Sequence, residues 1–216
     1  DSSIGGKTAI DTNYGKNLIG SFYHPIKTII DTDILISLDK KEINSALFEV
    51  VKYAILFSEN FLNYLETNLH ELDNKIILHN IIEQCCKMKS ELVSQDEYDR
   101  SLRMNLNFGH TVGHAIESIY GISHGEAIGY GIKCALYISQ KVGGLSKSEY
   151  KRILDLLERL TLPSIKLNSS EITNMIKRDK KVQNNINKFI LINKIASPYI
   201  SSDINQDLVR ESINQL

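Results

Sequence analysis

The sequence predicts a mainly α-helical protein with a short β segment in front. Residues 1–35 are rich in Gly and Thr and contain runs of β-branched residues, which are typical of strands and turns. From about Lys40 onward, apolar residues recur at helical spacing in successive stretches. Gly or Pro stands after several of these stretches, where helices usually end.

Each element follows from its own pattern. Two extended segments are expected, over residues 17–23 and, after Pro25, over residues 26–31. A third short strand is expected over residues 189–192. Helices are expected over residues 40–68, 73–92, 98–120, 124–142 and 170–178. A further helix is expected between Ser146, which caps it, and Pro163, which follows it, and a terminal helix from about residue 205.

Composition excludes several classes of function. The 216 residues carry a net charge of −1, which gives no reason to expect a nucleic-acid partner. No apolar run reaches membrane-spanning length, and no signal peptide is visible. Cys85 and Cys86 are adjacent and Cys134 is distant, so the sequence has no CxxC pair and the thiols are expected to be small buried hydrophobes.

The segment predicted as the third helix carries the strongest chemical signal. Four polar residues recur at i, i+4, i+7 and i+11: Arg103, Asn107, His110 and His114. This spacing predicts one face of a single helix. A solvated helix face is mostly Lys and Glu, so this set favours a functional surface over an ordinary exposed one.

A histidine-based metal site is plausible near this segment. His124 follows His114 by ten residues at a predicted helix start, and imidazole is the commonest ligand of catalytic zinc. Spacing alone pairs His110 with His114. The pattern is not the HExxH of metalloproteases, because no Glu follows His110.

Two charged residues interrupt an otherwise apolar helix. Glu49 and Lys52 are three residues apart and are expected to share one face. An internal ion pair is the better interpretation of this segment by itself, and a metal ligand is the alternative. A buried charge requires a partner under either interpretation.

The remaining charged or Gly-rich motifs are less informative. The run Gly5-Gly6-Lys7-Thr8 lacks the upstream Gly and the following helix that a phosphate-binding loop needs. The basic run over residues 178–181 is typical of a solvated face.

Six segments, in this order, resemble 3-dehydroquinate synthases: DSSIGGKTAIDT, YGKNLIGSFYHP, ALFEVVKYA, LRMNLNFGHTVGHAIE, SHGEAIGYG and DKK. The resemblance runs from residue 1 to about residue 192. It implies a multi-helix metal- and substrate-binding C-terminal domain over residues 39–216. Residues 1–38 would then be a short β remnant of an upstream α/β NAD-binding domain.

The resemblance also implies roles for individual residues. Zinc, or Co²⁺ in its place, would be held by Glu49, His110 and His124, which replaces the pairing that spacing gave. The implied catalytic residues are Lys7, Lys52, Asp99 and His114, the last for proton transfer near the departing phosphate. Substrate would be bound by Asp1, Lys7, Asn17, Lys52, Lys89, Arg103, Asn107, His114 and Lys180. NAD would be contacted by Asp1, Lys16, Ile34, Leu35, Ile36 and Ser37.

The implied activity is that of a cytoplasmic lyase of the shikimate pathway, which serves aromatic amino acid biosynthesis. It would convert 3-deoxy-D-arabino-heptulosonate 7-phosphate to 3-dehydroquinate and phosphate, with NAD as a catalytic cofactor. Asp99 departs from the family, which usually has Glu there, because its side chain is one methylene shorter. The chain begins without Met, and we expect it to be a C-terminal portion that is inactive by itself. The full-length protein is expected to be a homodimer.

Three other readings remain open. A metal-dependent polyol dehydrogenase typically has Asp where Glu49 stands and needs no carboxylate grip from Lys89 and Arg103. A sister cyclase acting on a neutral sugar phosphate would not need that grip either. A non-catalytic helical fragment that binds metal is the third alternative.

Overall fold

The computed structural model describes all residues except 14, 183–187 and 203, and it does not describe the side chains of residues 11, 15–17 and 179–182. The chain divides into two compact units. Unit 1 comprises residues 1–38 and 68–104, and unit 2 comprises residues 39–67 and 105–216. Residues 68–104 thus cluster with the front segment. The predicted division into a domain over residues 1–38 and another over residues 39–216 is a different one, and it stays a prediction.

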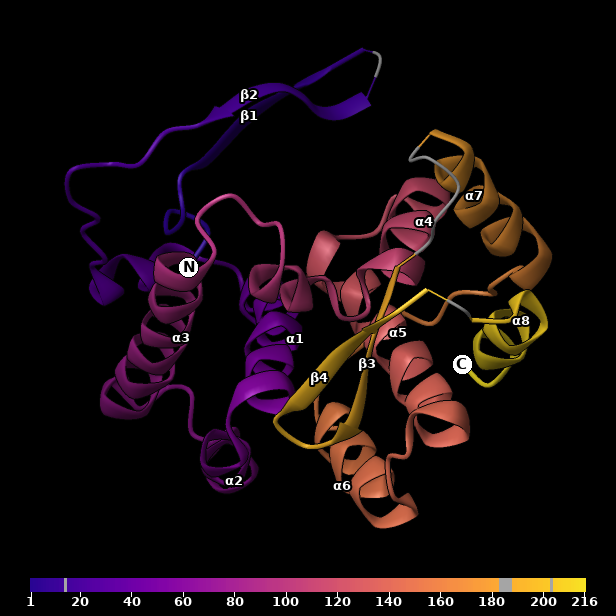
Figure 1. Cartoon of the computed structure of the whole chain (residues 1–216). Helices are drawn as coiled ribbons and strands as arrows, with labels where there is room; N and C mark the ends of the chain where they lie inside the picture. The colour runs from indigo at the N-terminus through magenta and orange to yellow at the C-terminus, as the bar shows by residue number, and fades with distance from the viewer. Residues whose placement is uncertain (14, 183–187, 203) are drawn as a thin grey trace. The chain divides into compact units, whose positions relative to one another are not determined.

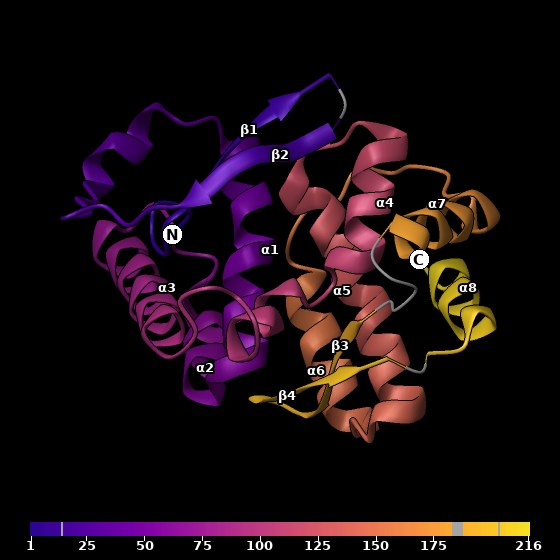
Figure 2. The ribbon, with the colours of Figure 1, turned by 45° about the horizontal axis from the view of Figure 1, so that its top comes forward.

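Unit 1 combines a β hairpin with a long helix. Strands β1 (Lys7–Thr12) and β2 (Gly15–Phe22) pair antiparallel (Figure 2). A 3₁₀ helix, η1 (Thr32–Ser37), follows the hairpin, and helix α3 (Lys75–Gln95) begins after the N-cap Asn74. Within this unit Phe22 and Tyr98 stack edge to face, with ring centroids 5.5 Å apart.

The strand predictions for the front segment were partly right. The extended segment over residues 17–23 is confirmed as β2, whereas its partner β1 was not predicted. The prediction of a strand over residues 26–31 was wrong, because the structure gives those residues no strand and leaves Ile26 and Ile29 largely exposed. A β-branched run becomes a strand only when another strand pairs with it, and β2 pairs with β1.

Unit 2 begins with two helices where one was predicted. Helices α1 (Lys40–Phe57) and α2 (Glu59–Asn68) are separated at Ser58, whose backbone is extended. The Ser58 hydroxyl accepts the backbone N–H of Phe61 at 3.1 Å, so this residue ends one helix and caps the next.

The rest of unit 2 is a helical array with a second hairpin. Helix α5 (His124–Ile138) continues into a π-helical turn, η3 (Ser139–Gly143), so the helix predicted over residues 124–142 ends earlier in regular form. The other elements are η2 (Leu102–Asn107, shared with unit 1), α4 (His110–Tyr120), α6 (Lys147–Leu157), α7 (Ser169–Val182), β3 (Phe189–Lys194), β4 (Ser197–Ser201) and α8 (Gln206–Asn214). Ser146 caps α6 as predicted. β3 and β4 form an antiparallel hairpin, of which only β3 was predicted.

The single helix predicted over residues 98–120 was wrong. Residues 102–107 form a 3₁₀ helix, and α4 starts only at His110. Gly109 lies between them with φ of +79°, a left-handed conformation that breaks a right-handed helix. Arg103 and Asn107 therefore do not share a helix face with His110 and His114, and the spacing argument holds only for the two histidines.

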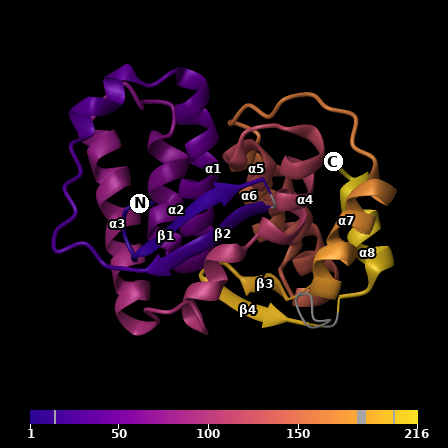
Figure 3. The ribbon, with the colours of Figure 1, turned by 90° about the horizontal axis from the view of Figure 1, so that it is seen from above.

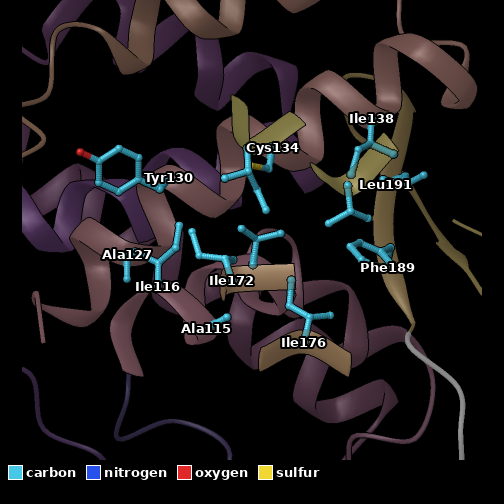
Figure 4. Packing of buried hydrophobic residues seen from close by; sticks show 13 residues of the cluster. Ala115, Ile116, Ala127, Tyr130, Cys134, Ile138, Ile172, Ile176, Phe189 and Leu191 are labelled. Atoms are coloured by element: carbon cyan, nitrogen blue, oxygen red, sulfur yellow. The ribbon is translucent and has the colours of Figure 1, made fainter. Parts of the chain in front are cut away.

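Helix α5 is the centre of unit 2 (Figure 1). It packs against α1, α4, α6, α8 and β3, and twelve of its fifteen residues are buried. Helices α7 and α8 lie side by side (Figure 3) and close the core on one side of α5. Figure 4 shows side chains from α4, α5, α7 and β3 pointing toward one another, among them Ile116, Ile172 and Leu191.

The cysteine and membrane expectations can be compared with the structure. No disulfide joins the three cysteines; Cys85 and Cys134 are buried, as predicted, whereas Cys86 is only partly buried. Burial raises the pKa of the Cys134 thiol to about 12. Among the described residues, no helix combines the length and the apolar character needed to cross a bilayer.

Candidate metal centre

Helices α4 and α5 approach closely enough to bring their histidines together. A Cβ added at Gly131 would lie 1.9 Å from the carbonyl oxygen of Gly109, and one added at Gly113 would lie 2.7 Å from Ile128. Only glycine allows this backbone contact. The contact places the start of α4, with its histidines, against the first turns of α5.

Three histidines form a cluster at this contact. One nitrogen from each of His110, His114 and His124 lies within 4.8 Å of the others. The ring centroids are 5.1 to 5.6 Å apart. The His110 side chain is mostly buried, whereas His114 and His124 are exposed. The cluster thus opens to solvent on one side, as a catalytic metal site requires.

Glu49 joins the cluster from α1. Its Oε1 lies 3.8 Å from Nε2 of His110, and Oε1 is buried without a hydrogen-bond partner among the described residues. Its Oε2 accepts from Lys52 Nζ at 2.5 Å, which confirms the predicted internal ion pair. A buried carboxylate oxygen without a donor is costly, and a cation beside His110 would satisfy it.

The charge state of His110 suits a metal ligand. Burial lowers the pKa of this imidazole well below its usual value, and the nearby Lys52 ammonium and His114 lower it further. The ring is therefore neutral at neutral pH, with a lone pair free to bind a cation. The donor set of imidazoles and one carboxylate is the set that zinc accepts.

The Nδ1 nitrogens of two rings have defined partners. Nδ1 of His110 donates to the backbone carbonyl of Phe108 at 3.2 Å, since a carbonyl can only accept. Nδ1 of His124 donates to Oε2 of Glu117 at 3.0 Å. Both rings then keep Nε2 as the acceptor nitrogen.

In unit 1 the structure brings together residues predicted to bind substrate. Lys89 Nζ lies 3.2 Å from Oδ2 of Asp1 and donates to its carbonyl at 2.7 Å. Lys7 forms an ion pair with Asp99. Asp99 has φ of +56°, and its Oδ1 is buried without a hydrogen-bond partner among the described residues. Predicted site residues of unit 1 thus form two cation–carboxylate pairs with one another.

Arg103 is buried in the same unit. Its Nη1 donates to the carbonyls of Gly5 and Glu97, both at 2.9 Å. Gly5 has φ of +101°, and a Cβ there would lie 2.3 Å from Nη2 of Arg103. Arg103 therefore fixes the N-terminal turn of the described chain in addition to any ligand it binds.

The other predicted site residues are less defined. The side chains of Lys16, Asn17 and Lys180 lie outside the described residues, although their backbones belong to β2 and α7. Asn107 is exposed at the end of η2. The predicted NAD-contacting segment, residues 34–37, lies in η1, with Ile34 and Ile36 exposed.

Two residues at these sites were missed by sequence reasoning. Asp96 accepts three backbone N–H groups from the loop that leads to Arg103, and Glu117 holds His124. Glu117 had a readable signal, because it lies at i+7 from His110 and i+3 from His114 on α4. Asp96 had none beyond the preference of Asp for loops.

Comparison with known proteins agrees with the earlier resemblance. Residues 46–182 match the family described as 3-dehydroquinate synthase C-terminal, and residues 1–45 match 3-dehydroquinate synthase N-terminal. The chain is 41% identical over 210 residues to the 3-dehydroquinate synthase of Clostridium botulinum and 37% identical over 214 residues to that of Dichelobacter nodosus. These matches cover 94% and 95% of this chain but only 59% and 58% of the relatives.

Solved structures share the fold over the whole chain. The first is a 2-epi-5-epi-valiolone synthase from Streptomyces hygroscopicus with NAD⁺ and Zn²⁺ bound, at a TM-score of 0.88 and 20% identity. The second is a 2-deoxy-scyllo-inosose synthase complexed with carbaglucose-6-phosphate, NAD⁺ and Co²⁺, at a TM-score of 0.83 and 23% identity. This chain covers 62% of each. With a family match over residues 46–182, the chain belongs to the 3-dehydroquinate synthase family.

Proposed function

We propose that the protein acts in the conversion of 3-deoxy-D-arabino-heptulosonate 7-phosphate to 3-dehydroquinate and phosphate, with NAD and a zinc ion. The curated relatives carry the name of this activity, and the chain spans about 60% of their length. The observation that supports the proposal best is the buried oxygen of Glu49 beside His110, within reach of the histidine cluster.

Glu49, His110 and His124 are the proposed metal ligands. Catalytic zinc takes three protein ligands and leaves one position open, and four candidate groups gather here. Glu49 is favoured because its buried Oε1 has no other partner among the described residues. His124 is a favoured ligand because its Nδ1 is held by a carboxylate, as is usual for metal-bound imidazoles.

Bound zinc would act as a Lewis acid on a substrate hydroxyl and ketone, and NAD would accept and return a hydride. The residues of unit 2 then have separate tasks. His114 is an exposed member of the cluster, and we assign it the proton transfer that accompanies the departure of the phosphate. Lys52 holds Glu49 in place and would donate to a substrate hydroxyl. Asn107 and Lys180 would bind the phosphate.

The residues of unit 1 would bind the acid end and hydroxyls of the substrate. Arg103 has a planar guanidinium that suits a carboxylate; its Nη1 donates to the two carbonyls, and we assign Nη2 and Nε to the substrate. Lys89 is positioned by Asp1, and Lys7 by Asp99. Asp99 stays our candidate base in place of the usual Glu. Asn17 would add a phosphate contact, and Lys16 with residues 34–37 would contact NAD.

The finer points of partner and location are also proposals. We propose that the full-length protein is a cytoplasmic homodimer. Its substrate is a small sugar-acid phosphate, and it has no nucleic-acid partner. A metal-dependent polyol dehydrogenase is the alternative enzyme. It predicts NAD reduction with glycerol, whereas the proposed activity releases phosphate without net reduction of NAD.

Metal titration of the chain tests the central assignment. Calorimetry with zinc should show about one ion per wild-type chain. Glu49→Ala and His124→Ala should abolish or strongly weaken binding, and His114→Ala should retain it. If His114→Ala abolishes binding while His124→Ala does not, the ligands are the HxxxH pair and the proposed set is wrong.

A further inference from the structure

Glu117 lies on the same face of α4 as the two histidines of that helix. His110, His114 and Glu117 follow the spacing i, i+4 and i+7. The Glu117 side chain is mostly buried, with 14% of it exposed. Its Oε2 lies 3.0 Å from Nδ1 of His124, which is the first residue of α5. The contact therefore joins a carboxylate of one helix to a proposed ligand on the next.

This contact selects one tautomer of the neutral His124 ring. An ionised carboxylate can only accept, so Nδ1 of His124 carries a hydrogen, and in the neutral ring Nε2 is the nitrogen with the lone pair. His110 has the same arrangement, with the Phe108 carbonyl in the role of the acceptor. In both rings, one from each helix, Nδ1 thus donates a hydrogen bond within the protein and Nε2 is left to bind a metal.

We propose that Glu117 is a positioning residue of the metal centre, a carboxylate that does not touch the ion but orients His124 for binding through Nε2. The inference rests on the proposed metal site and deepens it. Imidazoles that bind metals usually donate their other N–H to a carboxylate or carbonyl, and that bond fixes the ring and raises its basicity. The bond to Glu117 would also restrict the orientation of the His124 ring, whose side chain is 48% exposed.

The test measures metal affinity and ligand geometry. Zinc affinity is measured by competition with a chromophoric chelator for wild type, Glu117→Gln, Glu117→Ala and His124→Ala, and Co²⁺ spectra report the ligand set. Glu117→Gln should bind one ion about 10–100-fold more weakly, which is the range for loss of such partners. Its Co²⁺ spectrum should keep the wild-type form, because the ligands are unchanged.

Control measurements separate orientation from folding. Glu158→Gln removes the charge of an exposed glutamate in unit 2 and should leave affinity unchanged. The unfolding midpoint of metal-free Glu117→Gln should stay near that of wild type. If Glu117→Ala fails to fold, the isosteric Gln variant decides the question.

Three outcomes would overturn the inference. Wild-type affinity in Glu117→Gln would remove its role while leaving the metal site intact. Complete loss of binding with an altered Co²⁺ spectrum, as in His124→Ala, would make Glu117 a direct ligand. Absence of binding in the wild-type chain would instead refute the proposed metal site itself, and the inference with it.

Discussion

The carboxylate of Asp96 accepts the backbone N–H of Arg103 at 3.0 Å. It also accepts the N–H groups of Arg100 and Ser101, at 2.9 and 2.7 Å. One aspartate thus shapes the loop between α3 and η2, on which both Asp99 and the buried Arg103 depend. The conformation of this proposed substrate-binding loop is set by a residue that binds no substrate in our proposal.

Asp96 should make the stability of the chain depend on pH in acid. Hydrogen bonds from the backbone of Arg100, Ser101 and Arg103 lower the pKa of Asp96 to about 2, against 3.8 for a free carboxyl. Because the folded pKa is depressed, its stabilisation is present above pH 3.8 and is lost as pH falls toward about 2. Urea unfolding of wild type and Asp96→Asn should therefore differ at pH 6 and converge near pH 2.

A second aspartate variant controls for general charge effects. Asp155→Asn changes an exposed residue of α6 and should follow wild type at every pH. A constant gap between wild type and Asp96→Asn down to pH 2 would show that the ionised carboxylate is not what stabilises the loop.

Gly109→Ala should destabilise the protein more than Gly121→Ala. Both glycines flank α4 with positive φ, +79° and +63°, so alanine costs about 1–2 kcal/mol of strain at each. At Gly109 the new Cβ would also lie 2.7 Å from the backbone nitrogen of Ile132, whereas nothing lies within 4 Å at Gly121. We expect about 1–3 kcal/mol of additional loss at Gly109. Equal denaturation midpoints would mean that the close contact of α4 and α5 is absent in solution.

Removing Lys52 should leave Glu49 without its cation. The Lys52 side chain is almost fully buried, and its ammonium is 2.5 Å from Oε2 of Glu49. In chelator-treated protein, Lys52→Met should lower the free energy of unfolding by about 1–3 kcal/mol, the cost of an unsatisfied polar group. Adding Glu49→Gln should recover part of this loss. The exposed Lys41→Met should cost less than about 0.5 kcal/mol, and an equal loss there would contradict the role of the pair.

Arg103→Lys should weaken recognition of the substrate carboxylate. A lysine keeps the charge but loses the planar fork that suits a carboxylate. In enzyme that releases phosphate from the heptulosonate phosphate, the affinity for a substrate-like phosphonate should fall by about 1.5–3 kcal/mol. Circular dichroism of the variant is the control, since Arg103 also holds Gly5 and Glu97. Unchanged affinity in a folded variant would remove Arg103 from the substrate site.

The sequence predicted the helical class well because amphipathic periodicity is a local property. The errors lie where a tertiary contact decides the conformation. The helix predicted over residues 98–120 ran through Gly109, because its residue type does not reveal that φ is positive, which depends on the contact with α5. β1 was missed because its partner strand, not its composition, makes it a strand.

The candidate site was predicted unevenly for the same reason. Spacing along one helix can pair His110 with His114, but it cannot bring in Glu49 from α1 or His124 from α5. Sequence reasoning named both residues as candidates, but only the family resemblance selected them as ligands in place of His114. In the structure the four groups gather, which agrees with the proposed set without testing it.

The burial of α5 has a consequence for synthesis on the ribosome. Its surface packs against α1, which is made earlier, and against β3 and α8, which are made later. Residues such as Cys134 therefore stay uncovered until some 70 further residues have emerged, at about 5–20 residues per second. For those seconds the nascent chain exposes the most apolar helix of unit 2, which makes this segment the expected target of chaperones and the expected starting point of aggregation.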